Sequence, residues 1–349
     1  MERQERIDAI KALEGAAAGK VITYVTGDRH PAISAQVSDD ATRLIHSHLE
    51  EIGACKKILL FLYTRGGALN AVPRLVHLVR EYCSEFQVLV PYRAHSAGTG
   101  ICLGADAIVM GKMGELSPVD PSTVNPFNPQ AVQGDPRNLM TKVPISVEDV
   151  IAYLSLSEKA GLVSEEQRTE VFKSLASKVD PLALGNVHRV YNLIRLHTQE
   201  LLGFQMKSAE DKNNIQTIVK ALTETYTHDQ LIPRYLAERI GLKIIRPNVA
   251  LESAMWDLYK LYERDLKLRD IFDPEAILGT NNRTQVNLDV AFIESEKTGN
   301  VNSVEATVTR RIMSMGMQPQ MMLPGMQAQP PGTSEEFDVK IKPLGWRVI

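Results

Sequence analysis

The sequence predicts an α/β fold built on a parallel sheet, and two neighbouring segments carry this prediction. The runs KILLFLYT (residues 57–64) and FQVLVPY (residues 86–92) are apolar and rich in β-branched or aromatic residues, which is typical of buried strands. Each run ends in a turn of small residues that leads into a helix, over 70–83 and 99–104. Strands that alternate with helices favour a parallel sheet, and such sheets bind ligands at the carboxyl ends of their strands.

The other elements follow from periodicity and turn residues. Helical spacing predicts further helices over 2–18, 38–52, 146–159, 164–179, 184–202, 209–222, 232–240 and 250–268. Strands are expected at 21–25, 107–112 and 243–246, a β-hairpin at 286–295 and 301–312, and terminal strands at 337–341 and 346–349. We therefore divide the chain into a main domain over 1–249, a helix-plus-hairpin extension over 250–312, a flexible Met-, Gln- and Pro-rich linker over 313–336 and a terminal strand segment over 337–349.

The composition excludes several classes of function. The net charge of −3 gives no basic field for nucleic acid. The three cysteines lie inside apolar runs without metal-ligand spacing, which favours a reducing, cytoplasmic setting and no metal site. No apolar run reaches the roughly 18 residues of a membrane span, and residues 1–20 lack the apolar core of a secretory signal. Membrane association is therefore expected only through a partner.

Ser96 is the predicted nucleophile. A serine on a tight strand-to-helix turn exposes its hydroxyl, and the amides of the first helical turn have no intrahelical partners. The glycines Gly66 and Gly67 end the preceding strand, where a backbone without Cβ atoms can turn its N–H groups toward a ligand. The expected oxyanion donors are the amides of Gly67 and Ala97. The alternative is that Ser96 is only a helix N-cap, and His95 would point away from it in an extended chain.

Four motifs carry a resemblance to a known family: TRGG (64–67), HSAGT (95–99), GADAIVMGKMGELSPVDP (104–121) and YTHD (226–229). Over about residues 20 to 250 the chain resembles the serine dehydrogenase proteinase family, within the Clp protease, signal peptide peptidase A and crotonase superfamily. The resemblance implies repeated β-β-α units, a curved and mostly parallel sheet, and helices outside it.

Two candidates for the general base stay open. The resemblance implies a triad in the swapped order Ser96, Asp120, His228, in which His228 is the base. Signal peptide peptidases and the partner proteases of stomatin instead use a Ser-Lys dyad, and Lys142 lies in the corresponding region. Asp120 and His228 could also be simple turn or cap residues. Arg65 and Arg93 flank the site, either to bind a substrate carboxylate or to form surface ion pairs.

The sequence thus predicts a serine peptidase that cleaves peptides or proteins through an acyl-enzyme on Ser96. Without a Gly-x-Gly-x-x-Gly after a strand, no nicotinamide cofactor is expected. The alternatives are a crotonase-like acyl-thioester enzyme, which has no need of a serine nucleophile, and an inactive Clp-fold scaffold that binds partners. We also expect a homo-oligomer. The resembled families form trimers or larger rings, and helix 250–268 carries Met255, Trp256, Tyr259 and Tyr262, unless this face packs on its own domain.

Overall fold

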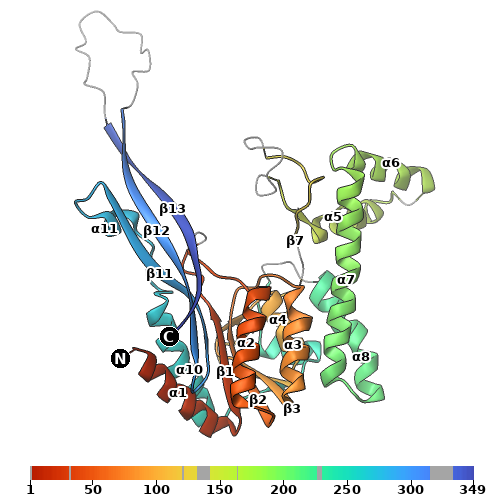
Figure 1. Cartoon of the computed structure of the whole chain (residues 1–349). Helices are drawn as coiled ribbons and strands as arrows, with labels where there is room; N and C mark the ends of the chain where they lie inside the picture. Colours follow the sequence, from red (N-terminus) through yellow and green to blue (C-terminus); the bar gives the residue numbers. More distant parts are fainter. Residues whose placement is uncertain are drawn as a thin grey trace, which may run out of the picture.

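A computed structural model describes residues 2–30, 33–119, 122–131, 142–162, 164–225, 230–314 and 333–349. A central sheet carries helices on both faces, and two arms project from it (Figure 1). One arm is the long hairpin of β12 and β13. The other contains α5, α6 and the outer part of α7.

The main sheet has eight strands, and the α/β class predicted from the sequence is confirmed. In spatial order they are β10 (Ile244–Ile245), β5 (Ala107–Met110), β3 (Cys83–Val90), β2 (Cys55–Tyr63), β1 (Lys20–Thr26), β11 (Arg283–Glu294), β12 (Gly299–Ser314) and β13 (Thr333–Val348). The first five strands are parallel to one another. The last three are antiparallel, and β11 pairs with β1 to join the two halves.

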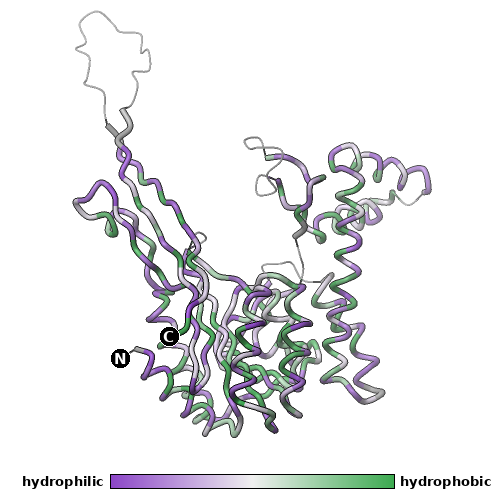
Figure 2. Tube along the Cα trace, in the orientation of Figure 1, coloured by the Kyte–Doolittle hydropathy of each residue, from purple (hydrophilic) through white to green (hydrophobic). Residues whose placement is uncertain are grey.

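Both faces of the parallel half are buried. One face packs against α1 (Glu2–Ala17) and α10 (Val249–Asp265). The opposite face packs against α2 (Asp39–Ile52), α3 (Ala71–Glu81), α4 (Ala97–Leu103), α7 (Pro181–Gln205) and α8 (Ala209–Lys220). Along β2, Leu59 and Phe61 therefore face one set of helices while Leu60 and Leu62 face the other, so the strand is apolar from Ile58 to its end. Figure 2 shows the apolar residues concentrated along the central strands and the helices beside them.

A small second sheet lies at the carboxyl ends of the main strands. It contains β4 (Arg93–Ala94), β6 (Glu115–Leu116) and β9 (Ile232–Pro233), with β4 parallel and β9 antiparallel to β6. The helix α9 (Arg234–Ile240) follows β9 directly. Three distant parts of the chain thereby meet beside the turn that holds Ser96.

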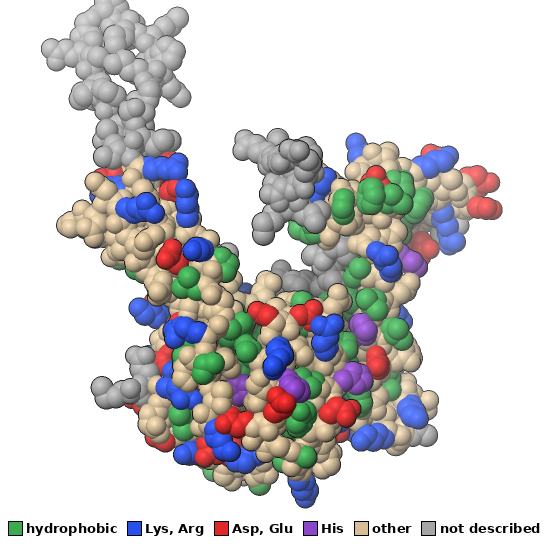
Figure 3. Space-filling model, in the orientation of Figure 1, with side chains coloured by type: hydrophobic (Ala, Val, Ile, Leu, Met, Phe, Trp, Pro, Cys, Tyr) green, Lys and Arg blue, Asp and Glu red, His purple; other side chains and the backbone are tan. Residues whose placement is uncertain are grey.

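The helical arm carries an apolar cavity of its own. Its base is the short pair β7 (Ser122–Thr123) and β8 (Ile145–Ser146), followed by α5 (Val147–Lys159) and α6 (Glu165–Ala176). Side chains of α5, α6 and α7, among them Leu154, Phe172 and Tyr191, line a cavity of about 490 Å³. Hydrophobic side chains gather on the surface of this arm in Figure 3. Between α8 and β9, residues Ala221–Thr225 form the π-helix η2.

The aromatic face of α10 is covered by the chain itself. Met255, Tyr259 and Tyr262 are almost completely buried, in the same cluster as α1 and the sheet. The alternative weighed for this helix, packing on its own domain, is what the structure shows. These buried side chains therefore lend no support to an intersubunit contact, and the expectation of a homo-oligomer depends on the family resemblance.

A buried ionic network ties α1 to the far end of the chain. Arg6 is 3% exposed; its Nε donates to Glu294 Oε2 at 2.7 Å, and its Nη1 pairs with Asp265. Tyr262 donates to the same Glu294 oxygen at 2.7 Å and contacts the Thr23 hydroxyl at 2.8 Å. Because both carboxylates have buried partners, the charges are compensated inside the protein.

Most of the secondary structure predicted for the C-terminal region is present in the structure. The hairpin expected at 286–295 and 301–312 is confirmed as β11 and β12. The two predicted terminal strands form the single strand β13, which pairs with β12 along its length. The short helix α11 (Pro274–Leu278) precedes β11. Most of the predicted linker lies outside the described residues, while 313–314 and 333–336 at its ends belong to β12 and β13. None of the helices in the described ranges combines the length and the apolar character that a membrane span requires.

Candidate active site

Ser96 occupies a strained turn between β4 and α4. Its backbone has φ 49° and ψ −110°, and within the described residues only Ala18 and Lys267 share a positive φ among residues other than glycine. Such a conformation is costly and persists only where the surroundings enforce it. Here the Ser96 amide donates to Ser117 Oγ at 2.8 Å, and Ser117 itself is 4% exposed.

Thr99 fixes the other side of this turn. Its hydroxyl lies 2.8 Å from the carbonyl oxygens of both Ala94 and Ser117, either of which can accept its proton, and it accepts the Ser117 amide at 3.1 Å. Ser117 in turn donates its hydroxyl to the Pro118 carbonyl at 3.1 Å. The nucleophile turn is therefore held by two buried hydroxyl side chains.

The glycine pair at the end of β2 touches the Ser96 turn. Gly66 has φ +116°, and a Cβ added there would lie 2.8 Å from Ser96 Cβ and 3.3 Å from its hydroxyl oxygen. Gly67 has φ +148°, and a Cβ there would lie 2.3 Å from the Val37 carbonyl oxygen. Only glycine satisfies both the backbone angles and the close approach. The structure thus brings together the two turns singled out in the sequence.

Two amides near the serine are available as donors. The Gly66 amide is occupied, because it donates to Thr64 Oγ1 at 3.0 Å. Gly67 forms a β-bridge with Val37, but its own amide takes no part in it. The Val37 amide donates to the Gly66 carbonyl, and the Val37 carbonyl accepts from the Ala68 amide. Ala97 is the first residue of α4, so its amide has no intrahelical acceptor. Within the described part of the chain, neither Gly67 nor Ala97 donates a backbone hydrogen bond outside regular elements.

A cavity of about 300 Å³ opens beside Ser96. Its wall is mostly polar and consists of Arg65, Tyr92, Arg93, His95, Ser96, Glu115, Ser117 and Leu231. The small sheet of β4, β6 and β9 supplies or adjoins most of these residues. The candidate nucleophile therefore faces a polar compartment at the carboxyl ends of the parallel strands, where such sheets bind ligands.

An ion-pair network lies in one wall of this cavity. Asp28 Oδ2 accepts from Arg65 Nε at 2.7 Å and from Arg93 Nη1 at 2.9 Å, while its Oδ1 accepts the Tyr63 hydroxyl at 2.9 Å. Arg93 also reaches Glu115 through Nε at 3.3 Å and the Tyr92 hydroxyl through Nη2 at 2.7 Å. Both arginines flagged in the sequence thus share one carboxylate.

His95 and Glu115 form a second polar pair in the cavity. His95 Nε2 lies 3.1 Å from Glu115 Oε1, and a carboxylate can only accept, so this nitrogen carries the proton. Burial would raise the pKa of Glu115, but the hydrogen bond from His95 and the charges of His95 and Arg93 hold that pKa below its ordinary value. Because the left-handed Ser96 turns the chain, His95 lines the same cavity as Ser96 instead of pointing away.

The predicted acid–base residues fall into two groups. Asp120 and His228 lie outside the described residues, but described residues three positions from each, Ser117 and Leu231, line the cavity. Lys142 is described: it forms a β-bridge with Gln130 and does not line the cavity. No group of three or more His, Cys, Asp or Glu side chains in the described ranges is placed to hold a metal ion.

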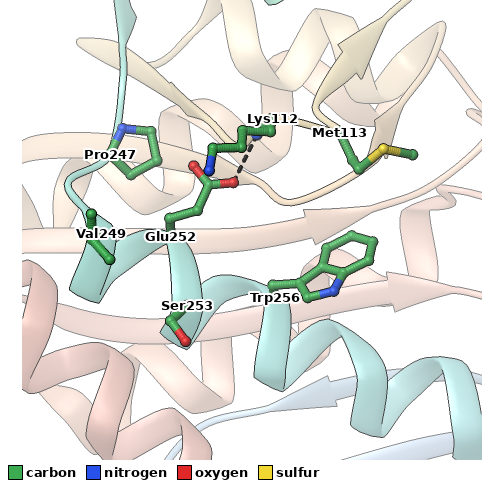
Figure 4. A pocket seen from close by; sticks show the side chains of 7 residues that line it. All are labelled: Lys112, Met113, Pro247, Val249, Glu252, Ser253 and Trp256. Atoms are coloured by element: carbon green, nitrogen blue, oxygen red, sulfur yellow. Dashed lines mark hydrogen bonds between the residues drawn. The ribbon is translucent and has the colours of Figure 1, made fainter.

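A larger cavity, of about 450 Å³, lies at the start of α10 (Figure 4). Its wall is mainly apolar, with Met113, Pro247, Val249 and Trp256, and Glu252 accepts the Lys112 amide at 2.8 Å. The serine in its wall, Ser253, lies inside α10 and does not share the positive φ of Ser96. We therefore place the candidate active site at the smaller, polar cavity.

Comparison with known proteins identifies a protease family over part of the chain. Residues 33–181 match the family described as ClpP-like SDH-type serine proteinase. The family predicted from the sequence is confirmed over this segment. The ClpP-like segment contains Gly66, Ser96, Asp120 and Lys142, whereas His228 follows it.

The curated relatives come from Methanocaldococcus jannaschii. Uncharacterized protein MJ0137 is 26% identical over 216 residues, which are 61% of this chain and 61% of that protein. Uncharacterized protein MJ1495 is 28% identical over 102 residues, 29% of this chain and 34% of that protein. The chain thus matches about three-fifths of the length of one relative and a third of the other.

Among solved structures, the chain is similar to two mutants of the 1510-N membrane-bound stomatin-specific protease. One has a TM-score of 0.36 and 14% identity and covers 66% of this chain and 80% of that one. The other, in complex with a substrate peptide, has a TM-score of 0.35 and 15% identity, with 61% and 72% covered. At these TM-scores the likeness adds no weight to an assignment of function.

Three parts of the site could not be predicted from the sequence. They are the ion pairs of Asp28, the contact between His95 and Glu115, and the hydrogen bonds of Ser117 and Thr99 that hold the Ser96 turn. Ser117 and Glu115 belong to the motif over 104–121, so the motif marked the region without indicating their contacts. Asp28 follows β1, far from Arg65 in sequence, and only the pairing of β1 with β2 brings the two together. No local sequence pattern predicts a contact between residues so far apart in the chain.

Proposed function

We propose that this chain is a serine peptidase in which Ser96 attacks the peptide carbonyl. One observation carries the proposal: Ser96 is held in a left-handed turn against Gly66, at the mouth of a polar cavity. The match of residues 33–181 to a serine proteinase family supports the same chemistry. The substrate would be a peptide or protein.

The amides of Gly67 and Ala97 would stabilise the oxyanion. When Ser96 Oγ forms its bond to the carbonyl carbon, the carbonyl oxygen gains negative charge, which the two N–H groups stabilise by donating hydrogen bonds to it. A general base takes the serine proton and returns it to the leaving amine as the C–N bond breaks. Water then attacks the acyl-enzyme by the same route and regenerates Ser96. Loss of one such donor typically costs about 10²–10³ in rate.

We infer that His228 is the base and that Asp120 orients it. Described residues close to both in the chain support this inference. Ser117 and Leu231 line the cavity, and the Val119 amide donates to the Leu222 carbonyl at 2.9 Å, which joins the segments that lead to Asp120 and His228. A triad is defined by geometry and not by chain order. Lys142, the base of the alternative dyad, belongs to the β-bridge with Gln130.

Two other functions are less well supported. A crotonase-like acyl-thioester enzyme would use the oxyanion donors but would not need a serine in a strained turn. A binding scaffold would need neither. The strained backbone at Ser96, fixed by Ser117 and Thr99, has a purpose in the peptidase alone.

An activity-based probe tests the proposal directly. A fluorophosphonate reports a working serine hydrolase because it reacts only with an activated serine. We expect stoichiometric labelling, with the adduct mapped to Ser96 by mass spectrometry. The variant Ser96→Ala should lose labelling and peptide hydrolysis but keep its thermal unfolding temperature. Ser84→Ala, which removes an exposed hydroxyl far from the cavity, is the control. Full hydrolysis by Ser96→Ala would exclude the mechanism.

A further inference from the structure

We propose that Arg65 makes the Ser96 cavity selective for peptides that carry a carboxylate beside the bond to be cleaved. This inference rests on the proposed function and names the class of substrate that the site accepts. Arg65 immediately precedes Gly66, the residue that touches Ser96, and lines the same cavity. A group bound by Arg65 would therefore lie next to the reacting serine.

One hydrogen bond orients the Arg65 guanidinium, and most of the side chain is exposed to solvent. Its Nε donates to Asp28 Oδ2 at 2.7 Å, and Asp28 is itself fixed by Tyr63 and Arg93. The side chain of Asp28 is 12% exposed, whereas that of Arg65 is 60% exposed. Within the described part of the chain, no hydrogen bond or ion pair occupies the terminal nitrogens Nη1 and Nη2 of Arg65. A planar guanidinium held in this way can bind a carboxylate through paired N–H groups.

Arg93 differs from Arg65 in this respect. Its three nitrogens reach Glu115, Asp28 and the Tyr92 hydroxyl, respectively. Arg93 therefore serves the network in the wall, and Arg65 is the one that can take a ligand. The sequence left both roles open for both arginines. Arg93 is used entirely in contacts within the wall, whereas Arg65 pairs with Asp28 through Nε alone and keeps Nη1 and Nη2 for a ligand.

The unoccupied guanidinium nitrogens of Arg65 favour an acidic ligand. Among the described residues, two arginines and one carboxylate, Glu115, line the cavity. Glu115 already accepts from Arg93 and His95, so its charge is compensated within the wall. Asp28 Oδ2 pairs with both arginines, so Arg65 is distinguished by its two terminal nitrogens, which have no partner among the described residues. Of the described residues that line the cavity, only Tyr92 and Leu231 have a large aromatic or apolar side chain, so a large apolar substrate side chain gains little there.

The experiment compares cleavage sites in a peptide library. A chymotryptic library from a proteome, which keeps internal Asp, Glu, Lys and Arg, is incubated with the wild-type protein, and mass spectrometry gives the frequency of Asp and Glu within two residues of each cleaved bond. We expect enrichment over the library in the wild type and about a tenfold loss of it in Arg65→Gln, the order expected of one charge-assisted hydrogen bond. Arg65→Glu should favour Lys and Arg instead.

Two further measurements show which carboxylate is recognised and whether the effect is specific to Arg65. A library with methyl-esterified carboxylates, compared with one amidated only at its C-termini, distinguishes a side-chain carboxylate from a terminal one. Arg74→Glu is the matched control. Arg74 is likewise an exposed arginine, 64%, paired with an aspartate, Asp39, but it lies on α3 and does not line the cavity. It should leave the preference unchanged.

The outcomes separate this inference from the proposed function. If fluorophosphonate fails to label Ser96, the peptidase proposal falls. If Ser96 is labelled and peptides are cleaved, but Arg65→Gln keeps the wild-type frequencies, the role of Arg65 is wrong. Equal thermal unfolding temperatures for Arg65→Gln and the wild type would confirm that a changed preference reflects binding and not loss of fold.

Discussion

Replacement of Gly66 by alanine tests the close contact between the two turns. The substitution has two separate costs. A residue with a Cβ at φ +116° strains the backbone, by about 1–3 kcal/mol. The new methyl group would also lie 2.8 Å from Ser96 Cβ and 3.1 Å from the His95 carbonyl oxygen, well inside an ordinary contact between carbon atoms of about 3.5–4.0 Å.

The collision predicts a loss of activity beyond the loss of stability. To restore an ordinary contact, the Ser96 turn must move by the better part of an ångström. A misplacement of about 1 Å at a reacting group can cost about 10²-fold in rate. We therefore expect Gly66→Ala to react with fluorophosphonate about 10²-fold more slowly, while urea unfolding shows a stability loss of about 1–3 kcal/mol.

Gly53→Ala is the control for the loss of stability that comes from backbone strain alone. Gly53 also has a positive φ, of 74°, but a Cβ there meets no atom within 4 Å. It should lose stability and keep the wild-type labelling rate. If Gly66→Ala labels as fast as the wild type, or if Gly53→Ala slows labelling equally, then the contact with Ser96 does not control the position of the nucleophile.

Four further predictions follow from the same contacts. Ser117→Ala removes the acceptor of the Ser96 amide, so labelling should slow at least about tenfold, since an unsatisfied buried group costs about 1–3 kcal/mol. His228→Ala should lose several orders of magnitude in hydrolysis, with a wild-type pH limb near about 6.5, while Lys142→Ala stays near wild type; the reverse result would establish the dyad. Arg6→Ala leaves the buried Glu294 charge uncompensated and should cost about 3–5 kcal/mol in urea unfolding without changing the labelling rate of the folded protein; a cost under about 1 kcal/mol would contradict this. Light scattering after gel filtration should give the mass of several chains, and the mass of one chain with full activity would exclude an obligate oligomer.

Periodicity and turn chemistry were sufficient to predict much of the fold. From Ile58 and Phe86 onward, β2 and β3 are buried on both faces and therefore appear as mainly apolar runs. The turns at Gly66 and Ser96 contain small residues because the backbones nearly touch, and that composition is visible in the sequence. The parallel arrangement then brings the two turns to one edge, as expected.

The parts that could not be predicted depend on distant contacts. The strands β4, β6 and β9 have two residues each, too few for any periodicity, yet their pairing builds the cavity wall. The attachment of β11 to β1 is likewise decided by tertiary packing, because nothing in either strand specifies its partner. The ionic role of Asp28 depends on this same kind of long-range pairing.

The junction between β1 and β11 has a consequence for how the chain folds as it is synthesised. Thr23 on β1 and Glu294 on β11 are bonded to each other although 271 positions separate them. While the ribosome is still making the intervening residues, the outer edge of β1 has no neighbour and Arg6 has no Glu294. An unpaired edge is a site of association with other chains. The nascent chain therefore depends on a late C-terminal strand to close its sheet, and premature termination before β11 should yield a product that aggregates.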